Sequence, residues 1–175
     1  MNKPLQLPNS LEFWSDPRMP YVETRRACQS RICYKAHSHP TLSIGAVDAG
    51  QSRFYSAFTD EVCIQQGSLV VIPAHIEHSC NPLPEQHWSY QMLHIDAAWL
   101  EQLSIEAHTS LLESIAIPQL RPFVLNDKAR YDAFCRMNLT LFDSNTLMFE
   151  KEHALIEGLT QLLFPYFDWQ QLPQQ

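Results

Sequence analysis

Apolar and polar residues alternate in short runs over roughly the first 125 residues of the chain. These runs are rich in β-branched and aromatic residues, which is typical of strands. The predicted strands cover 31–39, 41–47, 53–58, 61–65, 68–72 and 87–95. Hairpin turns are expected at Asp48–Gly50, Thr59–Asp60 and Gln66–Gly67, where turn-forming residues cluster. Many short strands at close spacing predict a sandwich or a barrel.

Helical spacing of apolar residues replaces this alternation after Pro122. The spacing predicts one helix over 127–142 and a second helix over 147–164. Ser144–Thr146 lies between them and is typical of a helix stop followed by a new start. The chain therefore ends in a predicted helical hairpin.

Two shorter helices, one beginning at Asp96 and one around 109–117, are expected to join the β-structure to this hairpin. The polar tail from Pro165 onward is expected to be a linker. The predicted fold is mainly β with C-terminal α. Residues 1–125 would form the β-domain with its N-terminal arm, and residues 126–170 would form the hairpin.

Composition narrows the possible partners and the compartment. The 175 residues are 45% hydrophobic and 18% charged, which suits one compact domain with a core. A net charge of −7 without a basic stripe predicts that these residues do not bind nucleic acid themselves. No apolar run is long enough for a membrane span or a secretory signal, and five irregularly spaced cysteines suggest reduced thiols. We expect a cytoplasmic location and no membrane contact.

Candidate metal ligands occur in two short clusters, His37 with His39 and His78 with Cys80. Alternate residues of a strand share a face, so each pair can point into the same cavity. Three imidazoles and a thiolate could complete a tetrahedral set for a divalent transition metal, with zinc as the first candidate. A metal-free ligand pocket and a purely structural role remain open for the histidines, and core packing remains open for Cys80.

A third group of candidates lies on the predicted strand 87–95. Trp88, Tyr90 and His94 share one face with Met92, and side chains of this kind commonly line small-molecule pockets. Tyr55 is a weaker candidate for contact with the ligand. We assign no catalytic residue, because no carboxylate pair, nucleophile motif or phosphate-binding loop is present.

The histidine clusters resemble the two motifs of the cupin superfamily. His37-Ser38-His39 is followed by a glycine-opened strand and then by Gly67-x5-Pro-x4-His78. Cupin enzymes have a glutamate shortly after the first motif, where this chain has Ser43, and a second glycine where it has His75. The resemblance implies a cupin-like double-stranded β-helix, or jelly-roll barrel. The missing carboxylate weakens the case for a metal-dependent enzyme.

A closer resemblance is to the N-terminal ligand-sensing domain of AraC-type transcription regulators. It rests on HSHPTLSIGAVDAG, GSLVVIPAHIEHSCNP and WSYQMLHIDAAWL. The resemblance implies a small-molecule effector in the barrel, a homodimer through the C-terminal helices, and DNA contact only through a separate helix-turn-helix domain. We expect that domain to be absent from these 175 residues. The N-terminal arm, with Pro4, Pro8, Pro17 and Pro20, would close over the barrel mouth as a lid.

Two functions follow from these patterns. The favoured hypothesis is a non-enzymatic sensing and dimerisation domain, in which an effector shifts the arrangement of arm and helices. The alternative is a stand-alone metal-dependent cupin enzyme of the oxygenase or isomerase type, with His37, His39 and His78 as metal ligands. A metal sensor without a separate organic effector is a third possibility.

Overall fold

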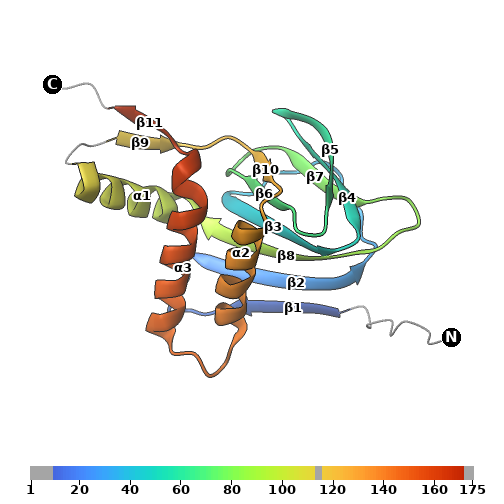
Figure 1. Ribbon diagram of the computed structural model, residues 1–175, viewed down its shortest axis with the longest axis horizontal. Helices are drawn as coiled ribbons and strands as arrows, with labels where there is room; N and C mark the ends of the chain where they lie inside the picture. Colours follow the sequence, from blue (N-terminus) through green and yellow to red (C-terminus); the bar gives the residue numbers. More distant parts are fainter. Residues whose placement is uncertain (1–9, 113–115, 172–175) are drawn as a thin grey trace.

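A six-stranded antiparallel sheet forms the centre of the computed structural model, in the order β1-β2-β8-β3-β6-β10 (Figure 1). The structure describes residues 10–112 and 116–171. The strands of this sheet are β1 (Ser10–Ser15), β2 (Val22–Ser30), β3 (Thr41–Ala49), β6 (Leu69–Ile72), β8 (Trp88–Asp96) and β10 (Phe123–Leu125). Its two long central members, β3 and β8, are neighbours over almost their whole length.

A second, three-stranded sheet has the order β5-β4-β7. Its strands are β4 (Gln51–Ser56), β5 (Thr59–Gln65) and β7 (His78–Pro82). Phe54 and Ile64 from this sheet pack against Ile72, Trp88 and Tyr90 from the first sheet in one buried apolar cluster. The two sheets therefore face each other and enclose the interior of a barrel, which confirms the predicted cupin-like fold.

Three α-helices and a small extra sheet complete the fold. The helices are α1 (Ala97–Leu112), α2 (Lys128–Phe142) and α3 (Met148–Leu163), followed by the short 3₁₀ helix η1 (Phe164–Tyr166). The strands β9 (Ala116–Gln119) and β11 (Asp168–Gln171) pair antiparallel. Asp96 accepts a hydrogen bond from the amide of Trp99 at 2.8 Å and so begins α1, while Asp127 caps α2 through the amide of Arg130.

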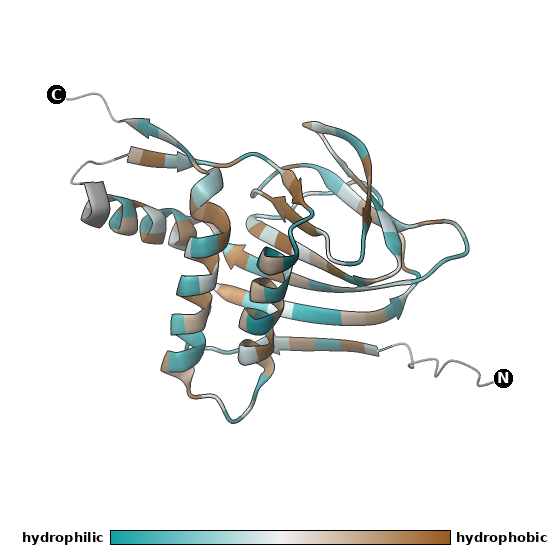
Figure 2. Ribbon diagram, viewed as in Figure 1, coloured by the Kyte–Doolittle hydropathy of each residue, from teal (hydrophilic) through white to brown (hydrophobic). Residues whose placement is uncertain are grey.

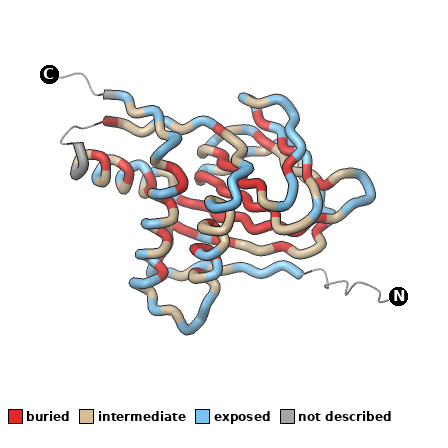
Figure 3. The backbone as a smooth tube through the Cα atoms, viewed as in Figure 1, coloured by how far each residue is buried: buried red, intermediate tan, exposed pale blue. Residues whose placement is uncertain are grey.

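Helices α2 and α3 cover the outer face of the six-stranded sheet (Figures 1 and 2). Leu155 and Leu159 of α3 belong to the same buried cluster as Ile44 of β3 and Leu93 of β8. Strands β3 and β8 are thus covered on both faces, by the barrel interior on one side and by helices on the other. Eight of the nine residues of β8 are buried, as Figure 3 shows for this part of the sheet.

A chain of buried hydrogen bonds joins the sheet to α2. Asp48 accepts hydrogen bonds from the Tyr131 hydroxyl at 2.8 Å and from the Gln91 amide at 2.9 Å. Asn138 donates to Gln91 at 2.6 Å and accepts from the Thr24 hydroxyl at 2.7 Å. The strand residues in these bonds face away from the barrel cavity. Each bond joins one of them to a residue of α2 or to another strand residue. The network fixes how α2 sits on the sheet.

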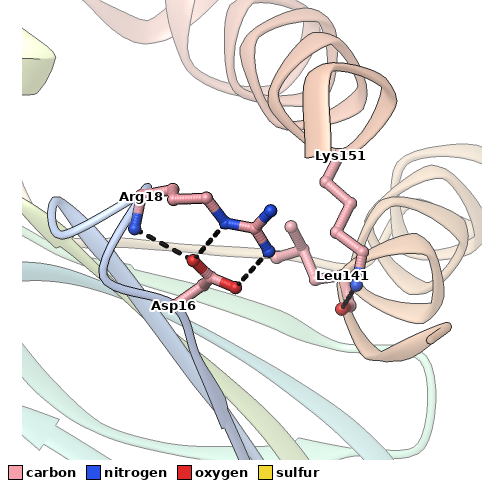
Figure 4. Close-up of polar contacts among 4 residues, drawn as sticks. All are labelled: Asp16, Arg18, Leu141 and Lys151. Carbon is pink, nitrogen blue, oxygen red and sulfur yellow. Dashed lines mark hydrogen bonds and ion pairs between the residues drawn. The ribbon is translucent and has the colours of Figure 1, made fainter. Parts of the chain in front are cut away.

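Polar contacts also tie the N-terminal strands and α3 into place (Figure 4). In the turn after β1, the guanidinium of Arg18 makes two hydrogen bonds to the carboxylate of Asp16, at 2.9 and 2.8 Å. The ammonium of Lys151, on α3, donates to the carbonyl oxygen of Leu141 at 2.5 Å. This carbonyl lies in the last turn of α2, where no later helical amide is available to it. The buried Lys151 thus supplies a hydrogen-bond donor to the C-terminal end of α2.

Replacing Lys151 by methionine is expected to lower the free energy of unfolding by about 1–3 kcal/mol, because the Leu141 carbonyl loses a charge-assisted hydrogen bond. The matched control is Lys128→Met. Lys128 is 86% exposed and paired with Asp132, and such surface pairs are worth about 0.5 kcal/mol or less. Urea unfolding of both variants measures the difference, and equal stabilities would contradict the assigned role of Lys151.

Several predicted elements are confirmed. The helices predicted over 127–142 and 147–164 are α2 and α3 with ends shifted by one residue, and five of the six predicted strands are present. Turns occur at Asp48–Gly50 and Gln66–Gly67. Gly50 has φ +78°, and a Cβ there would lie 2.6 Å from the His87 carbonyl oxygen, so this turn requires glycine.

Other expectations were wrong. Residues 31–39 form no strand; their one ladder contact is a bridge between His37 and His78. The turn expected at Thr59–Asp60 lies two residues earlier, since Thr59 already pairs with Ser56. Around 109–117 the chain does not form a separate helix: α1 continues to Leu112 and 116–119 is strand β9, while 113–115 lie outside the described residues. The ladder partner of β9 is more than 40 residues away, so local pattern could not reveal it.

The two ends of the chain also differ from expectation. The described part of the N-terminal arm is not a lid, because Ser10–Ser15 pairs with β2 as an edge strand; Pro4 and Pro8 lie outside the described residues. The tail is not a free linker over 168–171, which pairs with β9. Trp169 stacks on the buried His108 with ring centroids 4.0 Å apart. Trp169, an aromatic residue in this polar tail, was the sequence feature that indicated packing of the tail.

Candidate metal and ligand site in the barrel

A single small cavity between the two sheets collects most of the predicted site residues. The centre of a water-sized molecule can occupy about 30 Å³ of it, room for an ion with a small ligand or for a few waters. Its lining combines imidazoles, aromatic rings and one guanidinium, and consists of Arg25, Tyr34, His37, His39, Ser43, His78, Cys80, Trp88, Tyr90, Met92 and His94. Among the described residues that line it there is no carboxylate.

Backbone pairing brings the two histidine clusters together. The amide of His37 donates to the carbonyl of His78 at 3.0 Å, and the amide of His78 donates to the carbonyl of His37 at 2.9 Å. The carbonyl of His39 accepts from the amide of His75 at 2.7 Å. His37 and His39 thus lie on an irregular segment that is fastened to the start of β7. Their convergence with His78 depends on this pairing and not on a strand at 31–39.

Hydrogen bonds set the tautomers of two of these imidazoles. The Nδ1 of His37 lies 2.8 Å from the Lys35 carbonyl oxygen, and the Nδ1 of His78 lies 2.8 Å from the Ile76 carbonyl oxygen. A carbonyl oxygen only accepts, so Nδ1 carries the hydrogen in both rings and Nε2 keeps its lone pair. Metal-binding histidines are oriented by this kind of bond.

The three imidazoles fit a metal ion. One nitrogen from each of His37, His39 and His78 lies within 4.8 Å of the others, and the Nε2 atoms of His37 and His39 are 3.1 Å apart. Two nitrogen ligands about 2.0–2.1 Å from a tetrahedral zinc ion are separated by about 3.3 Å. The donor set is therefore close to a metal-binding arrangement. The described part of the chain contains no other such group of three histidine, cysteine or acidic side chains.

Ser43 occupies the position at which cupin enzymes carry a glutamate, and it holds a fourth imidazole. The Ser43 hydroxyl lies 2.9 Å from Nδ1 of His94, on the neighbouring strand β8. The His94 ring is tilted against His39 with centroids 5.1 Å apart. The cavity thus contains a neutral hydroxyl–imidazole pair in place of the acid. Among the described residues of this cavity wall, no aspartate or glutamate is available to act as a base.

Burial favours the neutral form of His39, His78 and His94 and the protonated thiol of Cys80. Desolvation lowers the pKa of His78 and of His39, and it lowers that of His94 to about 4, with the neighbouring His39 adding to the effect. Desolvation raises the pKa of Cys80 to about 12. Neutral imidazoles are the form that binds metal. Cys80 lines the cavity but is not part of the three-residue donor group.

The lowered pKa of His94 predicts a pH-dependent stability of the metal-free chain. The unfolded chain binds a proton at this residue below pH 6.5, whereas the folded chain binds it only near pH 4. The free energy of unfolding should therefore be complete above pH 6.5 and fall by up to about 3 kcal/mol as the pH drops to 4. Urea unfolding of the chelator-treated protein and of His94→Gln measures this. An equally steep pH dependence in His94→Gln would refute the assignment.

The remaining sequence candidates divide between cavity and surface. Trp88, Tyr90 and His94 line the cavity with Met92, as alternation along β8 predicts. Tyr55 is 41% exposed and does not line the cavity. On β4 the buried neighbours of Tyr55 point inward, so strand alternation places Tyr55 on the outside.

Arg25 and Tyr34 line the cavity and were missed at the sequence level. Arg25 stands next to Arg26, and two adjacent arginines do not by themselves indicate a residue of a cavity. In a strand, however, neighbours face opposite sides. Arg26 points outward to Glu12 and to the Phe142 ring, while Arg25 points into the barrel near Tyr90. Recognising 22–30 as a strand would have revealed this.

Comparison with known families agrees with this geometry. The model for the AraC-like ligand binding domain matches residues 19–135, which include both histidine clusters, the barrel strands from β2 on and the first half of α2. This chain belongs to the AraC-like ligand-binding domain family. Among curated proteins, none matches the sequence. Within the described residues, no helix has the length and apolarity that a membrane span requires.

Solved structures similar to this AraC-like domain have low sequence identity, and two of them are described as cupin proteins. An RmlC-like cupin family protein from Methanocaldococcus jannaschii has a TM-score of 0.44 and 7% identity, over 57% of this chain and 90% of that one. A cupin-like protein from Thermotoga maritima has a TM-score of 0.45 and 15% identity, over 50% and 68%. An oxalate decarboxylase variant from Bacillus subtilis has a TM-score of 0.39 and 14% identity, over 53% and 29%.

Proposed function

We propose that this AraC-like domain senses a small molecule through a metal centre in its barrel and passes the signal to its helices. His37, His39 and His78 would hold a divalent transition metal, with zinc as the first candidate. When bound, the metal supplies an open coordination position for an oxygen or nitrogen atom of the effector. The observation that carries the proposal is the convergence of three imidazole nitrogens within 4.8 Å in the barrel cavity of a chain that belongs to a ligand-binding domain family.

The polar network behind the cavity supports a path for the signal. Residues of β2 and β8 alternate between the two faces of the sheet, so Arg25 and Met92 line the cavity while their neighbours Thr24 and Gln91 contact α2. A change in cavity contents that shifts either strand therefore acts directly on Asn138 of α2. The effector would favour one of two arrangements of the sheet and the helical layer.

The helices would also pair two copies of the chain. Their buried faces are used against the barrel, whereas Leu139, Leu147 and Phe149 are between 59% and 66% exposed near the α2–α3 turn. We place a homodimer seam on this outer surface. DNA would be contacted through a separate helix-turn-helix domain, and the protein would act in the cytoplasm.

Zinc uptake and effector-dependent stabilisation test the proposal together. Chelator-treated protein is dialysed against zinc, analysed for metal, and then heated in the presence of a panel of small metabolites. We expect about one zinc ion per chain, and a subset of metabolites that raises the unfolding temperature only with zinc present. A chain that neither retains zinc nor responds to any metabolite would refute the proposed function.

An enzymatic role is the second candidate, since three histidines leave a coordination position free, as in catalytic metal sites. Against it stands the absence of a carboxylate among the described cavity residues, which leaves His94 as the nearest general base. Consumption of a stabilising metabolite by the zinc-loaded or iron-loaded protein would favour this candidate over sensing.

A further inference from the structure

The cavity contains a positive charge with no partner of opposite sign. Arg25 comes from β2 and lines the cavity beside Tyr90, whose ring centroid is 5.8 Å from the guanidinium carbon. Within the described part of the chain it forms no ion pair, and its buried Nε atom has no hydrogen-bond acceptor. Arg25 as a whole is half-buried, but a buried polar atom such as its Nε normally has a hydrogen-bond partner. The adjacent Arg26, by contrast, is paired with Glu12 at 2.7 Å.

One further donor in the same wall also lacks an acceptor. The indole Nε1 of Trp88 is buried without a partner, and Trp88 lines the cavity two strand positions beyond Tyr90. An indole N–H and a guanidinium N–H can only donate. Two of the four unpartnered buried polar atoms in the described structure are thus donors on residues of this one cavity. A ligand with acceptor oxygens would satisfy both donors.

The charge balance points the same way. A divalent ion held by neutral imidazoles would add two positive charges to that of Arg25, and no carboxylate lines the cavity to offset them. In a site of low dielectric constant, such an excess favours an anion strongly.

We infer that the effector is a small anion of the carboxylate type, held between the metal position at His37, His39 and His78 and the guanidinium of Arg25. The inference rests on the proposed sensing function and names the chemistry of its ligand. A planar fork of oxygens matches the donors of arginine. The free space of about 30 Å³ limits the ligand to a few non-hydrogen atoms unless side chains move.

The test compares formate and acetate with their neutral counterparts, formamide and acetamide, by calorimetric titration into zinc-loaded protein. The variants are Arg25→Gln and, as the matched control on the same strand, Arg26→Gln. We expect the wild-type chain to bind the acids at least about tenfold more tightly than the amides. Arg25→Gln should lose this preference, with zinc affinity kept or increased, whereas Arg26→Gln should match the wild type within about twofold.

Each outcome decides between the two proposals. If wild-type protein holds zinc but binds acids and amides alike, or if Arg25→Gln binds acids like the wild type, the inference is overturned and the metal centre stands. If the wild type holds no zinc, the proposed metal centre is refuted. Acid binding by the metal-free wild type is then compared with acid binding by metal-free Arg25→Gln, and equal binding overturns the inference. The wild-type acid-to-amide ratio is decisive even if Arg25→Gln does not fold, and circular dichroism establishes whether it does.

Discussion

Replacing His78 by alanine is expected to reduce the affinity of the chain for zinc by more than about 100-fold, since loss of even an outer partner of a ligand costs 10–100-fold. His78 supplies one of the three nitrogens, and its Nε2 is aimed by the bond from Nδ1 to the Ile76 carbonyl oxygen. With this nitrogen gone, two imidazoles of the donor group remain, and no carboxylate among the described cavity residues can replace it. Competition with a chromogenic chelator measures the affinity.

The control for His78→Ala is His153→Ala. The His153 side chain is 80% exposed on α3 and does not line the cavity. It lies beside the carboxylate of Glu157. Its removal should leave zinc affinity unchanged within about twofold. His39→Gln repeats the test at a second ligand position in case His78→Ala unfolds. Tight zinc binding by both ligand variants would contradict the three-histidine site.

Replacing Asn138 by alanine is expected to lower the free energy of unfolding by about 1–3 kcal/mol. Asn138 of α2 is fully buried against the sheet. Its removal leaves the buried side-chain oxygen of Gln91 without a donor, and such an unsatisfied group costs about 1–3 kcal/mol, whereas the Thr24 hydroxyl can still donate to the Met92 carbonyl oxygen at 3.1 Å. Urea unfolding measures the loss, with the exposed Arg136→Ala on the same helix as the control. A change below about 0.5 kcal/mol would contradict the role of the network.

The same variant tests signal transfer. If the network connects cavity and helices, Asn138→Ala should bind zinc as the wild type does, because Asn138 does not line the cavity. In the wild type we expect zinc binding to slow hydrogen exchange in α2, and Asn138→Ala should lose this effect. Undiminished protection of α2 in the variant would show that the coupling runs elsewhere.

The sequence predicted much of the fold because strand and helix periods are local properties. The helices α2 and α3 repeat apolar residues at helical spacing, and β8 places Trp88, Tyr90 and His94 on one face through simple alternation. Ladder partners are not local. The pairing of 168–171 with 116–119, and the addition of β1 to the sheet edge, depend on segments far apart in the chain or on charged, exposed strands.

The candidate site was predicted in part, and for a partly wrong reason. His37 and His39 were expected to converge with His78 along a strand, whereas an isolated bridge and an irregular segment bring them together. Arg25 was overlooked because two adjacent arginines do not indicate a residue of a cavity until their strand is recognised. Ser43 was read as the loss of an acid, but the structure shows that it holds His94 in the same wall. Such pairings of side chains require coordinates.

The central claim is that His37, His39 and His78 jointly hold a metal ion, and anomalous X-ray diffraction at the zinc edge tests it most directly. Crystals of the zinc-dialysed chain should show one strong anomalous peak about 2.0–2.1 Å from one nitrogen of each of these three rings. A crystal with no peak in the barrel, or with the peak bound by other residues, would contradict the account.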